Sequence, residues 1–174
     1  MLLVENRPAD TTKAGVSNRV IGISEMIVER GTDNMLVTYS LGSCLGVVIY
    51  DPTARVGGMI HCMLPLSKID PVKAQAMPAM FVDTGLPAML QAALNLGADI
   101  TRLKLKVAGA GSPLDDNGVF NIGDRNLAVL RKILWKNNIL ISSQETGGSE
   151  ARTVYLDMKS GDVLIRSNGQ TRQI

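Results

Sequence analysis

Aromatic side chains are scarce in this chain, and their scarcity excludes one class of function. Only 3% of the 174 residues are aromatic. Proteins that bind single-stranded nucleic acid stack the bases on such side chains. The formal net charge of +2, from 18 Lys and Arg against 16 Asp and Glu, gives no strongly basic face either. We therefore expect no nucleic-acid partner.

Long apolar runs are also absent. No stretch approaches the roughly 18 uninterrupted apolar residues that a membrane span requires. The first residues, Met1–Asn18, lack the apolar centre of a signal peptide. The sequence therefore predicts a soluble cytoplasmic protein without membrane insertion.

Cysteine and histidine are few. The chain has two Cys and one His, and their spacing does not form a recognisable zinc set. We expect neither a metal nor a cofactor. Without a secretory signal, reduced thiols are expected in place of a disulfide between Cys44 and Cys62.

The two residues with clear chemical potential are Cys44 and the single histidine, His61. Cys44 ends the run Thr38–Cys44, and His61 lies in the glycine-rich stretch Gly57–Pro65. A thiol is a useful nucleophile at neutral pH only when its thiolate is favoured, and a nearby imidazole is a common means to that end. The question is whether the two side chains meet.

The local pattern predicts a β-hairpin. The run Cys44–Tyr50 is rich in β-branched residues, Asp51–Arg55 has turn chemistry, and Val56–Leu64 resumes an apolar stretch. The two runs are therefore expected to be neighbouring antiparallel strands.

The centre of the turn determines the register. If it lies near Thr53 or Ala54, the residue opposite Cys44 falls between positions 62 and 64, and His61 lies one or two residues along the partner strand. With a rise of about 3.3 Å per residue and about 4.8 Å between strands, the two side chains can meet if they share a face. Adjacent strand residues face opposite ways, so Cys62 is then expected in the core.

Each residue also has a purely structural interpretation. A cysteine in an apolar strand is usually a small buried hydrophobe. A lone histidine beside a strand is more often structural than catalytic, and threonine is common in strands. Only the occurrence of Thr38, Cys44 and His61 together at this spacing favours catalysis.

The remaining pattern predicts an α+β protein, a layered sandwich of mixed sheets with two main helices on the outside. We expect a flexible extension over residues 1–17 and a single domain over 18–174. One helix is expected over Met80–Leu96, with Pro87 causing a kink or a delayed start and Gly97 as its stop. Asn121 or Asp124 is expected to open the second. The inward face of this second helix is predicted to comprise Leu127, Leu130, Leu134 and Trp135. The other expected strands are Val20–Glu29, Met35–Tyr39, Leu103–Val107, Ile139–Ser143, Arg152–Asp157 and Asp162–Ser167.

Two segments are expected to be loops. Ser67–Met77 is rich in Pro, Lys and small residues and predicts an exposed loop near the mouth of the site, which either handles substrate or merely connects. Ala108–Gly118 is glycine-rich but too irregular for a dinucleotide or phosphate loop. Its glycines favour close approach of backbone to the site or to a peptide substrate.

These motifs closely resemble the CheD family of chemoreceptor glutamine deamidases. The resemblance lies in Thr38-x-x-Leu-Gly-Ser-Cys44, in Gly58-x-x-His61-x-Met-Leu-Pro, in Asn121-Ile-Gly-x-Arg-Asn126, and in Glu145-Thr-Gly-Gly with Arg152 after it. It spans roughly residues 20–166. Two departures, Leu66 in place of an acid and the altered segment Ala108–Gly118, concern substrate contacts more than chemistry.

The resemblance implies a role for each site residue. Cys44 would be the nucleophile, His61 the base, and Thr38 the group that orients the imidazole. Gly42 and Ser43 would support the nucleophile, and Ser112 would lie in a substrate loop. The resemblance also implies a CheD-like sandwich fold.

The implied activity is deamidation of specific glutamines, with hydrolysis of methyl-glutamate esters as a further one, on the helical cytoplasmic bundle of chemoreceptors. A monomer associated with receptor arrays, and a CheC-type CheY phosphatase as a further partner, belong to the same expectation. Two alternatives stay open. One is a non-catalytic adaptor that binds receptors or the CheC-type partner, and the other is a cysteine amidase or peptidase for small molecules.

Overall fold

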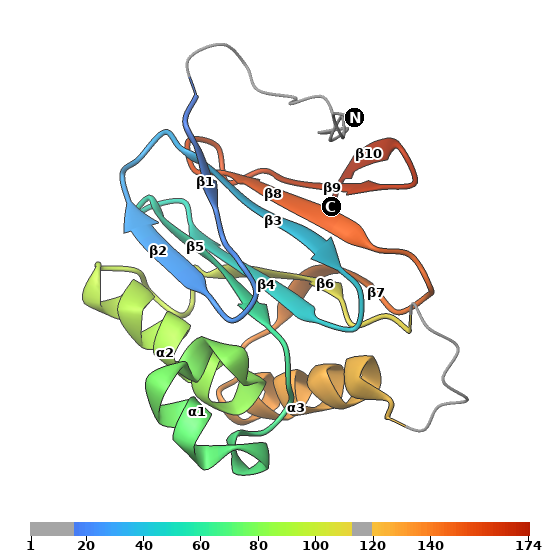
Figure 1. The fold of residues 1–174 in the computed structure, drawn as a ribbon. Coiled ribbons are helices and arrows are strands. Elements are labelled where there is room, and N and C mark those ends of the chain that lie inside the picture. The colour runs from blue at the N-terminus through green and yellow to red at the C-terminus, as the bar shows by residue number, and fades with distance from the viewer. Residues whose placement is uncertain (1–15, 113–119) are drawn as a thin grey trace, which may run out of the picture.

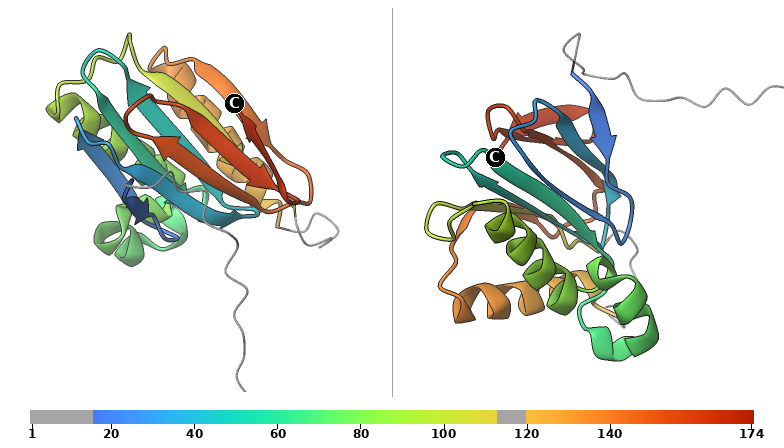
Figure 2. Two further views of the ribbon diagram at one scale, coloured as in Figure 1. Left: turned by 90° about the horizontal axis from the view of Figure 1, so that it is seen from above. Right: turned by 90° about the vertical axis from the view of Figure 1, so that its left-hand side faces the viewer.

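The computed structural model describes residues 16–112 and 120–174, and in them the chain forms three layers (Figure 1). One five-stranded sheet packs on a second five-stranded sheet, and the α-helices cover the outer face of the second (Figure 2). The expected fold class, an α+β layered sandwich with mixed sheets and outer helices, is confirmed. No helix among the described residues is long and apolar enough to cross a membrane.

The outer sheet, called sheet A here, has the strand order β1-β3-β8-β9-β10. Its strands are β1 (Asn18–Val20), β3 (Met35–Leu41), β8 (Arg152–Asp157), β9 (Val163–Ser167) and β10 (Gln170–Gln173). The pair β1 and β3 is parallel, and the other pairs are antiparallel.

The middle sheet, called sheet B, has the order β2-β5-β4-β6-β7. Its strands are β2 (Met26–Arg30), β4 (Leu45–Asp51), β5 (Val56–Cys62), β6 (Lys104–Gly109) and β7 (Ile141–Thr146). Only β6 and β7 run parallel, so this sheet is also mixed.

Strands β4 and β5 are buried along their whole length because both faces of sheet B are covered. Alternate residues divide between two apolar clusters. Leu45, Val47 and Ile49 pack toward the helices, whereas Val48 and Tyr50 pack between the sheets. The alternation on these two strands therefore separates a helix-side core from an inter-sheet core.

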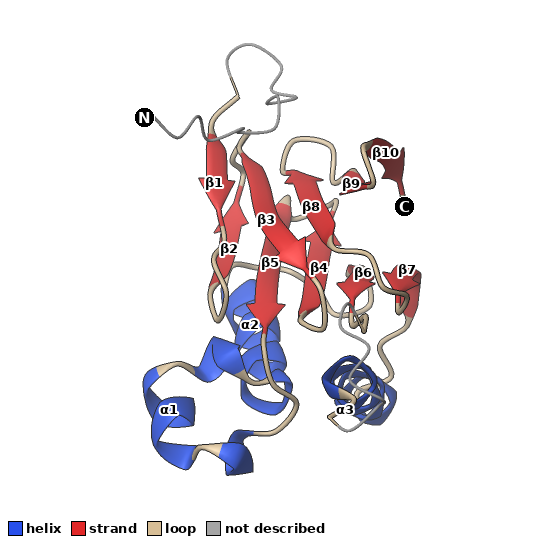
Figure 3. Cartoon of the chain, turned by 45° about the vertical axis from the view of Figure 1, so that its right-hand side comes forward, coloured by secondary structure: helices blue, strands red, loops and turns tan. Residues whose placement is uncertain are grey.

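The helices lie together on the face of sheet B that points away from sheet A (Figure 3). They are α1 (Pro71–Ala76), α2 (Val82–Asn95) and α3 (Ile122–Lys136), with short 3-10 turns at Ser67–Ile69 and Pro78–Met80. Helix α2 contains Pro87, and the chain turns out of it at Gly97, which has φ of +95°. The predicted stop at Gly97 is confirmed.

The predicted inward face of α3 is correct for three of its four residues. Leu130 and Leu134 are buried, and Leu127 packs against the helix-side core. Trp135 is 79% exposed, so its placement in the core was wrong. One residue of helix turns the side chain by about 100°, which carries Trp135 away from Leu134 toward the face of Arg131.

The predicted strand Val20–Glu29 is two strands in two different sheets. The chain leaves sheet A after β1, turns at residues 21–25, and enters sheet B at β2. Ser24 takes a positive φ of 66°, and the Glu25 side chain accepts from the Gly22 amide. This turn breaks the continuous strand that hydrophobicity predicts.

Other differences concern exposed segments. Ser67–Met77 is exposed as expected, but it contains a 3-10 turn and α1, where Asp70 caps the helix by accepting from the Lys73 amide. Strand β10 is polar and was not predicted. Most of the expected extension, residues 1–15, and positions 113–118 of the glycine-rich segment lie outside the described residues.

Candidate active site

The predicted hairpin is present, and its register determines where the candidate residues lie. Leu45 pairs with Cys62 and Gly46 pairs with His61 across β4 and β5. Extending this ladder by one residue places Cys44 opposite Met63, within the predicted range. Cys44 is therefore a diagonal neighbour of His61 on one face, where Cα atoms are about 7–8 Å apart and side chains still reach one another.

Two packing contacts establish which face that is. Cys44 packs against the inter-sheet core, and the His61 ring reaches across to Thr38 on β3 of sheet A. The His61 Nδ1 atom lies 2.7 Å from the Thr38 Oγ1 atom, and both residues are almost completely buried. The site thus lies between the two sheets, at the end where β4 begins.

The local sequence explains how Thr38 and the end of β3 can both face inward. Thr38 pairs with Val154 and Leu41 pairs with Arg152, so β3 carries one extra residue between the two pairs. This β-bulge includes Ser40 with a positive φ of 57°. Bulges redirect side chains and are frequent beside active sites.

The hydrogen bonds of Thr38 fix the protonation of the histidine. The Thr38 hydroxyl also lies 2.8 Å from the carbonyl oxygen of Ile21. A carbonyl can only accept, so the single hydroxyl proton goes to Ile21. The hydroxyl oxygen must then accept from Nδ1–H of His61. The proton of the neutral ring therefore sits on Nδ1, and Nε2 carries a free lone pair.

The other ring nitrogen, Nε2, is unprotonated and buried, and it has no hydrogen-bond partner among the described residues. Burial lowers the pKa of His61 to about 4, because the imidazolium loses its hydration. At neutral pH the ring is therefore neutral, with an unoccupied basic nitrogen.

The thiol of Cys44 is only partly buried, in contrast to the imidazole. Burial raises the pKa of this thiol above its ordinary value. In the resting site the Cys44 thiol and the His61 imidazole are therefore both neutral. A nucleophilic attack by this thiol would require a proton acceptor, because a stable thiolate is not present beforehand.

The turn that carries Cys44 is held in place by hydrogen bonds that its backbone carbonyl groups accept. The Gly42 carbonyl accepts from the Gly111 amide at 2.8 Å, and the Cys44 carbonyl accepts from the Ala110 amide at 2.8 Å. Gly109 has φ of +91°, and a Cβ there would lie 2.3 Å from the Cys44 carbonyl oxygen. Only glycine permits this approach, so the predicted role of the glycine-rich segment in close backbone contact is confirmed up to Gly111.

Gly46, opposite His61 on the neighbouring strand, leaves room for the Leu41 side chain. It pairs with His61, and a Cβ at this position would lie 2.6 Å from Leu41 Cδ1. A side chain here would push Leu41 out of the inter-sheet core or collide with it. The glycine thus allows Leu41 to pack in the inter-sheet core.

Asn126 of α3 joins the site, although sequence reasoning gave it no role. Its side-chain amide donates to the Ser43 carbonyl at 3.1 Å and to the Met63 carbonyl at 3.2 Å. Asn126 is completely buried. It lies four residues before the buried Leu130, on the same inward face of α3. A polar residue on the inward face of a helix must find partners, and this pattern is the signal that identifies it.

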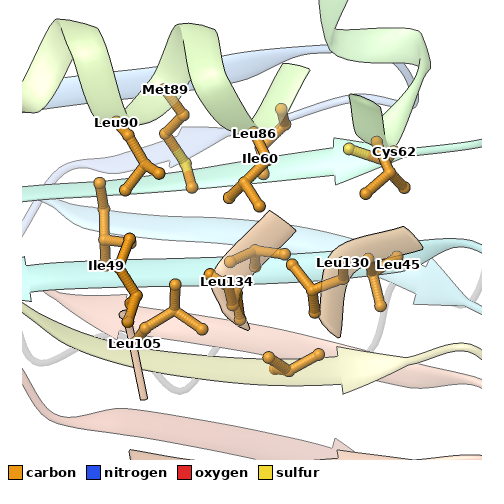
Figure 4. Packing of buried hydrophobic residues seen from close by; sticks show 14 of the residues in the cluster. Leu45, Ile49, Ile60, Cys62, Leu86, Met89, Leu90, Leu105, Leu130 and Leu134 are labelled. Carbon is orange, nitrogen blue, oxygen red and sulfur yellow. The ribbon is translucent and has the colours of Figure 1, made fainter. Parts of the chain in front are cut away.

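Cys62 faces away from the site, as predicted. It belongs to the helix-side core with Leu45 and Ile60 (Figure 4). Burial, followed by the nearby Cys44 and Asp83, raises the pKa of its thiol strongly. Cys62 is therefore a structural residue, and both cysteines are free.

Two predicted supporting features lie near the site but differ in their connection to it. Ser112 is exposed, and its amide donates to the Gly148 carbonyl at 2.8 Å, which places it beside the turn Gly147–Gly148. The two ends of the segment 66–80 lie close together near His61, because the Met63 and Leu64 amides both donate to the Met80 carbonyl. In the described ranges, no three His, Cys, Asp or Glu side chains gather to hold a metal ion.

The family model and the relatives that match this chain belong to one family. Residues 63–167 match the family model described as CheD chemotactic sensory transduction. The "Probable chemoreceptor glutamine deamidase CheD 1" of Syntrophus aciditrophicus is 46% identical over 150 residues, which are 86% of this chain and 94% of the relative. The "Probable chemoreceptor glutamine deamidase CheD" of Solibacter usitatus is 43% identical over 155 residues, 89% of this chain and 92% of that protein.

Among solved structures, the Bacillus licheniformis hypothetical protein YfiH aligns with a TM-score of 0.44 and 15% sequence identity. The alignment covers 71% of this chain and 50% of the YfiH chain.

Proposed function

The chain belongs to the CheD family, and from that premise we propose that it is a cysteine-dependent deamidase that converts specific chemoreceptor glutamines to glutamate. One observation carries the proposal. The Thr38 hydroxyl, engaged as donor to Ile21, leaves the His61 ring protonated on Nδ1 and basic on Nε2, on the face that Cys44 shares. The two relatives are named as probable chemoreceptor glutamine deamidases, which supports the proposal.

The first half of the reaction forms a thioester. His61 Nε2 takes the thiol proton as Cys44 Sγ attacks the carboxamide carbon of the substrate glutamine. The resulting imidazolium then gives this proton to the departing nitrogen, and ammonia leaves. The hydrogen bond from Nδ1–H to Thr38 keeps the ring oriented through both transfers.

The second half regenerates the enzyme. Nε2 takes a proton from water, the hydroxide attacks the thioester carbon, and the Cys44 thiol leaves with the proton. The product is a glutamate side chain. Hydrolysis of a methyl-glutamate ester follows the same steps with methanol as the leaving group, so we propose it as a second activity of the same site.

The oxyanion formed in each half requires backbone donors. The carbonyls of Gly42 and Cys44 are tied to the segment Ala110–Gly111. We therefore propose the backbone amides of the turn that carries Cys44 as the oxyanion donors. The turn is held in place, and preorganised donors stabilise an oxyanion without reorganisation. We propose that Ser112 contacts substrate, and its exposure beside Gly148 supports this role.

We also propose that residues 18–174 act as one domain and as a monomer in the cytoplasm, at receptor arrays. The two apolar clusters share strands β4 and β5, which supports a single folding unit. The substrate is then the helical cytoplasmic bundle of a receptor, and a CheC-type phosphatase is a further partner.

The experiment measures ammonia release and binding in parallel. A glutamine-bearing receptor cytoplasmic fragment and free glutamine are each incubated with the protein. Ammonia released from the fragment but not from free glutamine supports the proposal. Binding of the fragment without ammonia release would instead identify an adaptor, and efficient release from free glutamine would identify a small-molecule amidase.

A further inference from the structure

Beyond the triad, we propose that Asn126 is a positioning residue that sets the placement of Cys44 against His61. The inference rests on the proposed function and deepens it. It starts from the two hydrogen bonds that the Asn126 side chain makes to two chain segments, one on each side of the site.

The chemistry of the two acceptors fixes the orientation of the amide. The Ser43 and Met63 atoms that it contacts are both carbonyl oxygens, at 3.1 and 3.2 Å. Carbonyl oxygens only accept, so both must face the NH₂ group of Asn126, which has two protons. Both protons are therefore used, and the side chain bridges the two carbonyls.

The two bridged segments are the ones that carry the reacting groups. Ser43 directly precedes Cys44, and Met63 lies two residues beyond His61 on β5. The ladder between β4 and β5 ends with the pair Leu45 and Cys62, so the bridge begins where the ladder stops. One side chain thus replaces the next rung and holds the two strand ends at a defined separation.

Two backbone groups beside the bridge form their hydrogen bonds to other segments. The Met63 amide donates to the Met80 carbonyl, away from β4. The Cys44 carbonyl accepts from Ala110 on the opposite side. Cys44 is therefore tied to Ala110, directly after β6, and Met63 is tied to the segment 66–80, and Asn126 links the two.

The burial of Asn126 supports a specific role. Its side chain is completely buried, and its Oδ1 atom has no partner among the described residues. A buried, unsatisfied acceptor is unfavourable and rare. An apolar residue at this position of α3 would avoid it and join the helix-side core, so the bridge is a feature that stability alone does not favour.

The test measures the reactivity of Cys44 toward iodoacetamide as a function of pH, together with kcat and KM for deamidation. The variants are Asn126→Ala, which removes the bridge, and Asn126→Asp, which replaces the donor with oxygen. Asn137→Asp is the matched control, because Asn137 lies on the last turn after α3 and donates its side-chain amide to a helix carbonyl far from the site.

We expect both Asn126 variants to lose about tenfold in the rate of Cys44 alkylation and in kcat, with KM changed less than about twofold, since misplacement of a reacting pair affects the chemical step. Asn137→Asp should resemble wild type in each of these measurements. Circular dichroism establishes that each variant is folded.

Unchanged alkylation and kcat in folded Asn126 variants would overturn the proposal. So would failure of both variants to fold, because the bridge would then hold the fold in place of the site. Failure of the proposed function has a different signature. It would leave wild type without deamidation, and Cys44 would react equally fast in wild type and in His61→Ala.

Discussion

The imidazole of His61 donates from Nδ1 to the hydroxyl of Thr38, whose own proton goes to the Ile21 carbonyl. This chain of two buried hydrogen bonds runs from the turn after β1 through β3 to β5. A threonine thereby does what a carboxylate does in many triads, since it selects the tautomer, but it brings no charge. The histidine stays neutral and basic on Nε2.

Replacement of Thr38 by Val tests this relationship with little change in volume. The Nδ1–H of His61 and the Ile21 carbonyl would lose their partner. We expect kcat/KM for deamidation to fall on the order of 10²-fold, because the ring loses its orienting contact. Stability should fall by about 1–3 kcal/mol, the range for buried groups left unpaired.

Thr84→Val is the matched control for this change. The Thr84 hydroxyl donates to the Pro78 carbonyl at 2.7 Å outside the site. Denaturant unfolding and steady-state kinetics on both variants separate stability from activity. Equal kinetic losses in the two variants would show that Thr38 has no special role.

The titration of His61 can be observed directly, because it is the only histidine in the chain. A two-dimensional NMR titration of its ring should show a midpoint near its lowered pKa of about 4, compared with 6.5 for an unperturbed side chain. Above that midpoint, Nδ1 should appear protonated and Nε2 unprotonated. The opposite tautomer would contradict the hydrogen-bond assignment, and a midpoint near 6.5 would contradict the effect of burial on the ring.

The same pKa difference predicts how stability depends on pH. Between about pH 6.5 and 4 the unfolded chain binds a proton at His61 that the folded protein does not. Stability must therefore decrease as pH falls through this range, by roughly 3 kcal/mol in total. His61→Gln should lose this part of the pH dependence, as measured by urea unfolding at several pH values.

Much of the site could be predicted from the sequence because its geometry is local. Cys44 and His61 lie on one hairpin, so the turn Asp51–Arg55 and the alternation of strand residues determine their shared face. Cys62 follows from the same alternation. Thr38 lies on a different sheet, and its assignment depended on family resemblance, since a lone threonine carries no signal.

What could not be predicted depends on long-range packing. The bond from Thr38 to Ile21 requires β1 and β2 to lie in different sheets, whereas their hydrophobicity reads as one strand. Asn126 can be recognised only as a polar residue on the inward face of α3, because its partners are backbone carbonyls, which have no sequence signature. Trp135 was assigned to the core because it is apolar, but it lies on the exposed face of α3.

Asp51 provides a test of the fold that is independent of the chemistry. Its buried carboxylate accepts from the Thr53, Ala54 and Asp99 amides and from Arg102. Burial opposes the charge, but these partners outweigh it and hold the pKa well below its usual range. The group thus ties the hairpin turn to the segment after α2.

We expect Asp51→Asn to lose about 3 kcal/mol of stability, as breaking a buried charged network does, while the folded fraction keeps its activity. The control is Asp33→Asn, which removes an exposed ion pair with Arg55 and should lose less than about 1 kcal/mol. The Asp51 contribution is present above the unfolded pKa and decreases as pH falls below it. Thermal unfolding of both variants is measured above and below pH 4. Equal losses of stability in Asp51→Asn and Asp33→Asn would show that the Asp51 network is unimportant.

The most direct test of the account compares the two cysteines. A receptor cytoplasmic fragment is incubated with wild type, Cys44→Ala or Cys62→Ala, and its glutamines are examined by peptide mass spectrometry. The account predicts conversion of glutamine to glutamate by wild type and by Cys62→Ala, and none by folded Cys44→Ala. Conversion by Cys44→Ala at the wild-type rate would contradict the assignment of the nucleophile, and conversion by none of the three would contradict the deamidase itself.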